Sequence, residues 1–233
     1  MAEIKGPRKD RRQPRPQEKK TRSMSRHRNE RRQQSNCSEI GTPECIAKLH
    51  DIPPADKAHP NMWMKLGLQG VTVVGSAGNS GPLATRQCMP SNFGTFYASH
   101  PGSCPYVTSV GATMLLSNRS QTVAKDTNWA SSGGFSWYYP TPASGSGLPD
   151  ISALDKNVAV AVLGELDVAD GTSAATPLVG AIFNRINEER LAVGKSTVGF
   201  VNPVLYANPG MFDDLVTGDN SMCDIEGFNA VKG

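Results

Sequence analysis

The stretch Gly171-Thr-Ser-Ala-Ala-Thr-Pro177 decides the fold, because the most specific chemistry of the chain can be placed relative to it. Small residues surround one serine, Ser173, and the apolar residues from Leu178 to Ile186 recur at the three- and four-residue steps of a helix. Because proline is tolerated in a first helical turn, we expect this helix to begin just before Pro177. Ser173 would then lie at the helix N-terminus, where free N–H groups and the helix dipole stabilise a nucleophilic oxygen. An ordinary N-cap serine is the alternative interpretation.

Helix and strand patterns alternate around this stretch. Met62–Leu68 is typical of the end of a helix that stops at Gly70, and Val71–Val74 is a β-branched run of the kind found in buried parallel strands. The glycine-rich loop Ser76–Gly81 follows that strand, at the end where open α/β sheets bind ligands. Two further strands are expected over Tyr106–Val110 and Val158–Leu163. The pattern predicts an α/β fold built on a doubly wound parallel sheet.

The charge of the chain is divided between two opposite segments. Residues 1–36 hold thirteen Lys and Arg against four Asp and Glu, whereas the rest of the chain is acidic. The basic segment has no apolar run for a signal peptide or membrane anchor, and its composition predicts a disordered tail. It also has no aromatic residue for stacking on bases, so a solvated tail is favoured over a nucleic-acid-binding arm.

Several separated motifs resemble the sedolisins, the serine-carboxyl peptidases. The nucleophile stretch is shared by subtilisins and sedolisins, and the sedolisin-like segments are Asn187–Tyr206, Met64–Val74, Ser103–Thr113 and Ser131–Ser136. The resemblance runs from about Cys37 to Gly233 and is strongest to fungal tripeptidyl-peptidase-like members. It implies an incomplete subtilisin-like doubly wound parallel sheet, with 37–61 as a remnant of the start of the catalytic domain and 62–233 as a partial peptidase domain.

One long segment of the sedolisin pattern has no counterpart between Asn61 and Met62. In that family the segment carries the catalytic glutamate and aspartate, which supply the base for the serine. No complete catalytic triad can therefore be named, and helix faces such as those of Ile182 and Phe183 are expected to lack partners. The candidates for a substitute base are His50, His59, His100, Asp126, Asp150, Glu165, Asp167 and Asp170, with the last two expected on the turn leading to Ser173.

The resemblance assigns the remaining parts of an acyl-transfer site. Ser173 is the expected nucleophile, and Asn79 stands where sedolisins carry an oxyanion-stabilising aspartate. An asparagine donates a hydrogen bond at any pH, although a turn residue is an equal alternative at this position. Ser132, Gly133 and Gly134 correspond to the strand that pairs with the extended substrate, where glycines allow another chain to approach closely, and a plain glycine loop is an equal alternative.

The resemblance also implies one calcium ion. Its ligands would be the Asp214 carboxylate and the carbonyls of Leu215, Val231 and Gly233, but a closing aspartate of the family pattern has no counterpart. Calcium takes six to eight oxygen ligands, so we expect an incomplete site with weak binding at best, and an acidic surface turn is the alternative.

Five cysteines leave one without a partner if the others form disulfides. Cys37–Cys45 and Cys88–Cys104 are the candidate disulfides, Cys223 has no evident partner, and buried thiols are the alternative.

The expected function is that of a serine-type peptidase acting on peptides or proteins, with no membrane or nucleic-acid partner. By resemblance the protein is extracellular. Because the catalytic glutamate and aspartate are absent, we expect the chain to be inactive or to represent an incomplete gene model. The alternative is a pseudo-peptidase that binds peptides without cleaving them, or a chain whose basic tail contacts nucleic acid.

Overall fold

A computed structural model describes residues 35–38, 42–43, 58–83, 98–136, 139–140 and 147–232. The chain divides into two units, Met1–Gln33 and Gln34–Gly233, and all described elements belong to the second. The predicted basic tail lies outside the described residues, apart from Ser35 and Asn36, which open the first strand.

The central sheet confirms the predicted α/β class. Its members are β1 (Ser35–Ser38), β3 (Thr72–Ser76), β5 (Thr108–Leu115), β6 (Gln121–Val123) and β9 (Ile151–Leu154). Strands β1, β3 and β5 run parallel in that order, and β9 is parallel to β5. Strand β6 pairs antiparallel with the last residues of β5, so the sheet is mixed.

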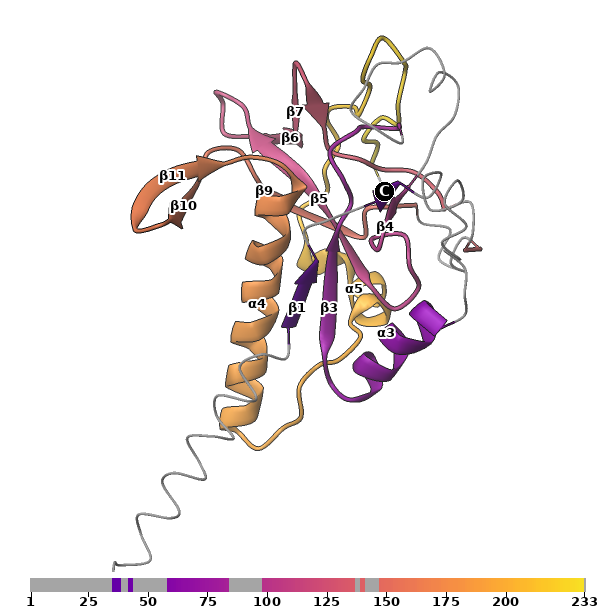
Figure 1. Cartoon of the computed structure of the whole chain (residues 1–233), viewed down its shortest axis with the longest axis vertical. Helices are drawn as coiled ribbons and strands as arrows, with labels where there is room; N and C mark the ends of the chain where they lie inside the picture. The colour runs from indigo at the N-terminus through magenta and orange to yellow at the C-terminus, as the bar shows by residue number, and fades with distance from the viewer. Residues whose placement is uncertain are drawn as a thin grey trace, which may run out of the picture. The chain divides into compact units, whose positions relative to one another are not determined.

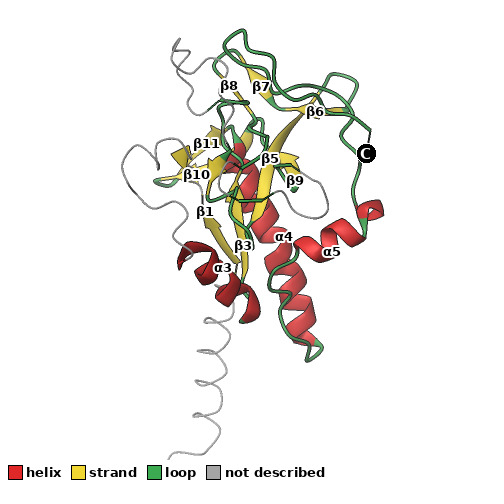
Figure 2. Ribbon diagram, turned by 90° about the vertical axis from the view of Figure 1, so that its right-hand side faces the viewer, coloured by secondary structure: helices red, strands yellow, loops and turns green. Residues whose placement is uncertain are grey.

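The sheet is covered on two faces because its strands are apolar on both. Side chains alternate along a strand, so neighbouring residues of β3 face opposite sides. Val74 packs with Phe183 of α4 (Thr172–Ala192), and Val73 packs in a second cluster with Trp63 of α3 (Ala58–Leu68). Figures 1 and 2 show α4 and α3 against these faces. This sheet, parallel except for β6 and covered on both faces, matches the subtilisin-like architecture expected from the sequence.

The shorter strands form three separate pairs. They are β2 (Thr42–Pro43) with β4 (Ser99–His100), β7 (Lys125–Asp126) with β8 (Trp129–Ala130), and β10 (Val158–Val162) with β11 (Glu165–Ala169). The chain ends with helix α5 (Asn202–Ala207), the short 3₁₀ helix η2 (Pro209–Met211) and an irregular tail.

Two predicted boundaries were wrong in informative ways. Helix α4 begins at Thr172, five residues before Pro177, because Gly171 adopts a left-handed φ of 103° and starts the helix there. Pro177 therefore lies inside the helix, where its missing N–H removes a bond to the Ser173 carbonyl. The strand expected over Tyr106–Val110 begins instead at Thr108, because Tyr106 has a φ of 70°.

The Val158–Leu163 strand forms, but outside the parallel sheet. Its residues form β10, which pairs antiparallel with β11 in a separate hairpin. The end of this apolar run is exposed, with Val162 51% and Leu163 101% accessible. Figure 1 shows this hairpin leading directly into the first turn of α4.

The cysteine pairing also differs from the prediction. Cys104 is a buried thiol that contacts His100 Nδ1 at 3.3 Å and the Tyr139 hydroxyl at 3.6 Å, so a Cys88–Cys104 disulfide is wrong. Cys223 does form a disulfide, and its partner lies outside the described side chains. The alternative of a buried thiol holds for Cys104. The predicted Cys37–Cys45 pair also lies outside the described side chains.

Within the described ranges, no helix is long and apolar enough to cross a membrane.

Candidate active site

Ser173 occupies the second residue of α4 and is half-buried. The first turn of α4 is built on Gly171, whose carbonyl accepts hydrogen bonds from the N–H of Ala174 at 2.8 Å and of Ala175 at 3.3 Å. The N-terminal turn of a helix carries the positive end of the helix dipole. This environment stabilises negative charge that develops near the Ser173 oxygen.

Asn79 lies directly against this turn. Its side-chain Oδ1 accepts the Thr172 N–H at 2.8 Å and the Thr172 hydroxyl at 3.0 Å. The same hydroxyl accepts the Gly78 N–H at 3.2 Å, so it acts as both donor and acceptor. Thr172 is fully buried, and it joins the loop after β3 to the start of α4.

These bonds fix which end of the Asn79 amide can donate. Because two donors of Thr172 face Oδ1, the amide cannot be turned over without placing NH₂ against them, and Nδ2 remains the donating end. A Cβ added to Gly171 would lie 2.9 Å from Nδ2, so this nitrogen sits beside the turn that leads into Ser173. The arrangement suits an oxyanion donor. Asn79 was a predicted site residue, whereas Thr172 was not, because it has no signal beyond its place beside Ser173.

The segment Ser131–Ser136 supports the Asn79 loop. The Ser132 N–H donates to the Gly78 carbonyl at 2.8 Å, and the Ser132 hydroxyl accepts the Ser80 N–H at 2.9 Å. Gly134 and Leu148 exchange both backbone bonds, at 3.1 and 2.7 Å. Gly133 lies between these anchored residues, and its N–H and carbonyl make no backbone hydrogen bond within the described part of the chain.

Three of the candidate bases are carboxylates that already bond to other residues. Asp150 accepts the Ser109 N–H at 2.6 Å and the Tyr206 hydroxyl at 2.5 Å, and its burial raises the pKa of its carboxyl. Asp126 and Asp170 both bind Lys156 Nζ, at 2.6 and 2.8 Å. Bonding to Lys156 lowers the pKa of both carboxyls, which makes them poor proton acceptors at neutral pH.

The other candidate bases are placed less favourably for that role. Glu165 and Asp167 are exposed on β11, so Asp167 is on a strand rather than on the turn, whereas Asp170 directly precedes Gly171. His100 contacts Cys104. The side chains of His50 and His59 lie outside the described residues.

Asp155 is a buried carboxylate that the sequence analysis missed. It follows β9, is 0% exposed, and its Oδ2 accepts the Gly171 N–H at 2.9 Å. Its Oδ1 is buried without a hydrogen-bond partner among the described residues. Burial, followed by the nearby Asp170 charge, raises the pKa of this carboxyl to about 6, against the lowering effect of the Gly171 bond. An aspartate next to a lysine is typical of the protein surface, so no sequence pattern indicated that Asp155 is buried.

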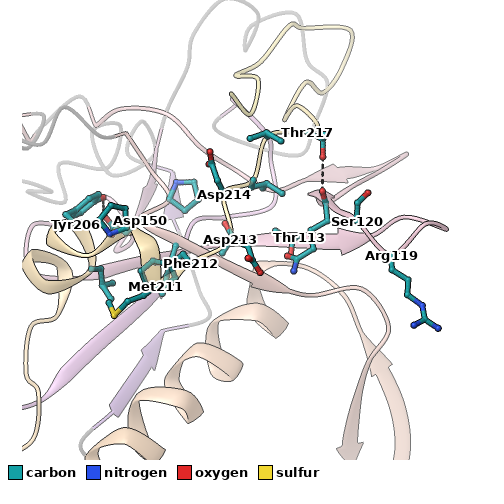
Figure 3. Close-up of a pocket in the computed structure, with 18 residues that line it drawn as sticks. Thr113, Arg119, Ser120, Asp150, Tyr206, Met211, Phe212, Asp213, Asp214 and Thr217 are labelled. Atoms are coloured by element: carbon teal, nitrogen blue, oxygen red, sulfur yellow. Dashed lines mark hydrogen bonds between the residues drawn. The ribbon is translucent and has the colours of Figure 1, made fainter. Parts of the chain in front are cut away.

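The predicted calcium ligands lie apart from this site. Asp214 and Leu215 line a cavity of about 1040 Å³ near η2, together with Asp213 (Figure 3), but Val231 does not line it and Gly233 is outside the described residues. The described residues include no cluster of three metal-binding His, Cys, Asp or Glu side chains. Of the four predicted ligands, the structure therefore places Asp214 and Leu215 at this cavity.

Comparison with known proteins agrees with this geometry. The profile of the subtilase family (peptidase S8) matches residues 16–198, and the chain belongs to that family. The fold is similar to that of a Pseudomonas sedolisin, a serine-carboxyl proteinase, with a TM-score of 0.68 and 24% identity over 86% of this chain and 60% of the other.

Among curated proteins, sedolisin-type relatives are prominent. The chain is 38% identical to tripeptidyl-peptidase sed1 of Aspergillus fumigatus over 73% of this chain and 34% of the relative. It is 35% identical to aorsin of Aspergillus oryzae over the same shares. The sedolisin resemblance is thus confirmed, and the chain spans about a third of the length of these relatives.

Proposed function

We propose that this chain carries the nucleophile and oxyanion half of a sedolisin-type serine peptidase site. The observation that carries the proposal is the pair of hydrogen bonds that Thr172 donates to Asn79 Oδ1. These bonds leave Asn79 Nδ2 beside the turn that leads into Ser173. In acyl transfer the Ser173 oxygen would attack a peptide carbonyl, and Asn79 would donate to the oxygen that becomes negative. The peptide C–N bond then breaks as a proton passes from the serine to the leaving amine.

That proton transfer requires a base, and in sedolisins the base lies on the segment that has no counterpart between Asn61 and Met62. A serine without its base keeps only the residual catalysis of the oxyanion donors and of binding. We therefore propose that the 233-residue chain hydrolyses peptides negligibly by itself. Its extracellular location and its calcium ion are further proposals that rest on the family alone.

The test separates reactivity of the serine from turnover. A fluorophosphonate probe, which forms a phosphorus–oxygen bond with an activated serine and releases fluoride, should label the chain slowly and should not label Ser173→Ala. A tripeptide amide with a fluorogenic leaving group should not be turned over between pH 3 and 8. Turnover that disappears in Ser173→Ala would refute the proposed inactivity, and equal labelling of both proteins would refute the nucleophile assignment.

A second function, peptide binding without cleavage, is favoured by Gly133. Its neighbours are anchored to Gly78 and Leu148, while its own backbone N–H and carbonyl bond to no backbone group among the described residues and could pair with an extended peptide. Calorimetry of Ser173→Ala with short apolar peptides tests this proposal. Gly133→Pro removes the donor and should abolish the binding, so binding that survives this change would place the peptide elsewhere.

A further inference from the structure

The β10–β11 hairpin is closed at its base by three contacts between the residues that precede and follow it. Asp155 Oδ2 accepts the Gly171 N–H at 2.9 Å, Lys156 Nζ binds Asp170 Oδ2 at 2.8 Å, and the Asn157 N–H donates to Asp170 Oδ1 at 2.7 Å. We call these three contacts the hairpin latch. The latch joins the end of β9 to the residues from which α4 begins, immediately before Ser173.

Asp155 is the buried member of this latch, and its position is costly. Its backbone N–H is held by the Thr113 carbonyl at 3.1 Å, so the residue is tied to β5. A buried carboxylate oxygen without a hydrogen bond, such as Oδ1, costs free energy that a neutral or apolar residue would avoid. The hydrogen bond from the Gly171 N–H to Oδ2 is the contact that offsets part of this cost.

Gly171 transmits that contact to the nucleophile. Its φ of 103° is accessible to glycine with little strain, and its N–H and its carbonyl form hydrogen bonds with different parts of the chain. The N–H is held by Asp155, while the carbonyl receives the N–H of Ala174 in the first turn of α4. The orientation of the Gly171 peptide therefore sets where α4 starts, and Ser173 is two residues further along.

We propose that Asp155 is a positioning residue for Ser173, which acts through Gly171 by fixing the turn from which α4 begins. The inference rests on the proposed role of Ser173 as nucleophile. Asp155 is buried and is separated from the serine by the Gly171 turn. It therefore acts on the position of Ser173 rather than on proton transfer. The other charged groups near it are Asp170 and Lys156, and Asp126 reaches it only through Lys156.

The positioning should depend on pH. Because burial raises the pKa of Asp155 to about 6, its carboxyl changes charge between the pH values of the cell interior and of an acidic medium. The ionised form is the stronger hydrogen-bond acceptor, so the Gly171 N–H is held most tightly above that pH. Asp170 cannot mimic this transition, because its bond to Lys156 lowers the pKa of its carboxyl.

One resonance can report the latch in the full chain. Asp170–Gly171 is the single Asp–Gly step in the sequence, so labelling Asp at the carbonyl carbon and Gly at nitrogen yields one cross-peak, that of the Gly171 amide. The Gly171 proton should lie downfield and titrate with a midpoint near 6. The titration should vanish in Asp155→Asn, whose amide oxygen still accepts the bond, and in Asp155→Ala the amide proton should exchange about tenfold faster.

The matched control is Asp126→Asn, which removes one partner of Lys156 and leaves the Asp155–Gly171 bond in place. It should keep the Gly171 titration. Fluorophosphonate labelling of Ser173 then tests the consequence: at equal folded fraction, Asp155→Ala should react about tenfold more slowly than wild type, and Asp155→Asn should restore the rate.

The outcomes separate the two proposals. A Gly171 resonance that ignores pH, or that is unchanged in Asp155→Ala, overturns the inference, as does normal Ser173 labelling in Asp155→Ala. If Gly171 titrates as expected but Ser173 reacts in none of the proteins, the proposed nucleophile role fails, and the positioning role fails with it.

Discussion

The side-chain oxygen of Asn79 and the buried Thr172 form a two-point contact, through the backbone N–H at 2.8 Å and the hydroxyl at 3.0 Å. This contact joins the loop after β3 to the helix that bears the serine, although the two residues are 93 positions apart. It is the geometric basis of the proposed oxyanion site, because it orients the Asn79 amide.

Thr172→Val should weaken this contact while preserving the shape of the side chain. The change leaves the Gly78 N–H without its acceptor and removes one donor to Asn79, which should cost about 1–3 kcal/mol of unfolding free energy. Urea denaturation measures the loss, and Thr172→Ser, which keeps the hydroxyl, is the control. Equal stability of wild type and the valine variant would show that the hydroxyl bonds contribute nothing.

Asn79→Asp should make the reactivity of Ser173 dependent on pH. With one carboxyl oxygen bound to Thr172, the other can donate only when it is protonated, and an unperturbed aspartate loses its proton near pH 4. Removing one oxyanion donor costs roughly 3 kcal/mol of barrier, or about a hundredfold in rate. The labelling rate of the aspartate variant should therefore fall as pH rises through that pKa. The labelling rate of wild type should show no such fall, because the Asn79 amide does not ionise.

The comparison applies equally to a version of the chain that carries an added segment with a catalytic glutamate and aspartate, measured as two pH–rate profiles. Coincident profiles would mean that Asn79 does not face the oxyanion, and the interpretation as a simple turn residue would hold.

Asp155 should make the fold more stable in acid than at neutral pH. Its folded pKa of about 6 lies above the ordinary value of 3.8, so the folded state binds the proton more tightly. This contribution is fully present below pH 3.8 and is lost as pH rises through 6. Asp155→Asn keeps the acceptor for Gly171 without the charge, so it should raise the melting temperature at pH 8 and leave it nearly unchanged at pH 3.5. A melting temperature that falls at pH 8 would contradict the raised pKa.

Calcium should stabilise the chain little. Asp214 and Leu215 line the cavity near η2, but the described residues do not complete a shell, so we expect a dissociation constant weaker than about 1 mM. At 1 mM calcium the gain in unfolding free energy should then stay below about 0.4 kcal/mol. Thermal melts with calcium and with a chelator measure this difference, and a shift of many degrees would establish a complete site.

The two faces of α4 should respond oppositely to substitution. Phe183 is 7% exposed in the core cluster, so Phe183→Ala should cost about 3–5 kcal/mol. Ile182 is 57% exposed and lies in an apolar stripe with Leu178 and Ile186, so Ile182→Lys should leave the fold intact and reduce aggregation. Light scattering and denaturation separate the two effects. A large loss of stability in Ile182→Lys would show that this face is covered in solution.

The local sequence pattern determined where strands and helices form, but not which other elements they pair or pack with. The β-branched run at Val71–Val74 became the first part of β3 because a doubly covered parallel strand must be apolar on both faces, and Gly171 marked the turn before Ser173. The expectation that Ile182 would lack partners was right, and the same expectation for Phe183 was wrong. The apolar run at Val158–Leu163 forms a strand as expected but pairs outside the parallel sheet, since composition does not state which neighbour a strand will find.

By itself, the sequence determined the α/β class and the resemblance to sedolisins, and it predicted Ser173 and Asn79 as site residues, because these depend on short stretches whose spacing has a direct physical meaning. Only the tertiary structure decided that Cys104 is a thiol, that Thr172 orients Asn79, and that Asp155 holds Gly171. Each of these three facts joins residues that are distant in sequence or gives an ordinary side chain a buried environment. Hydrogen bonding and burial arise from packing, and packing is defined only when the whole chain has folded.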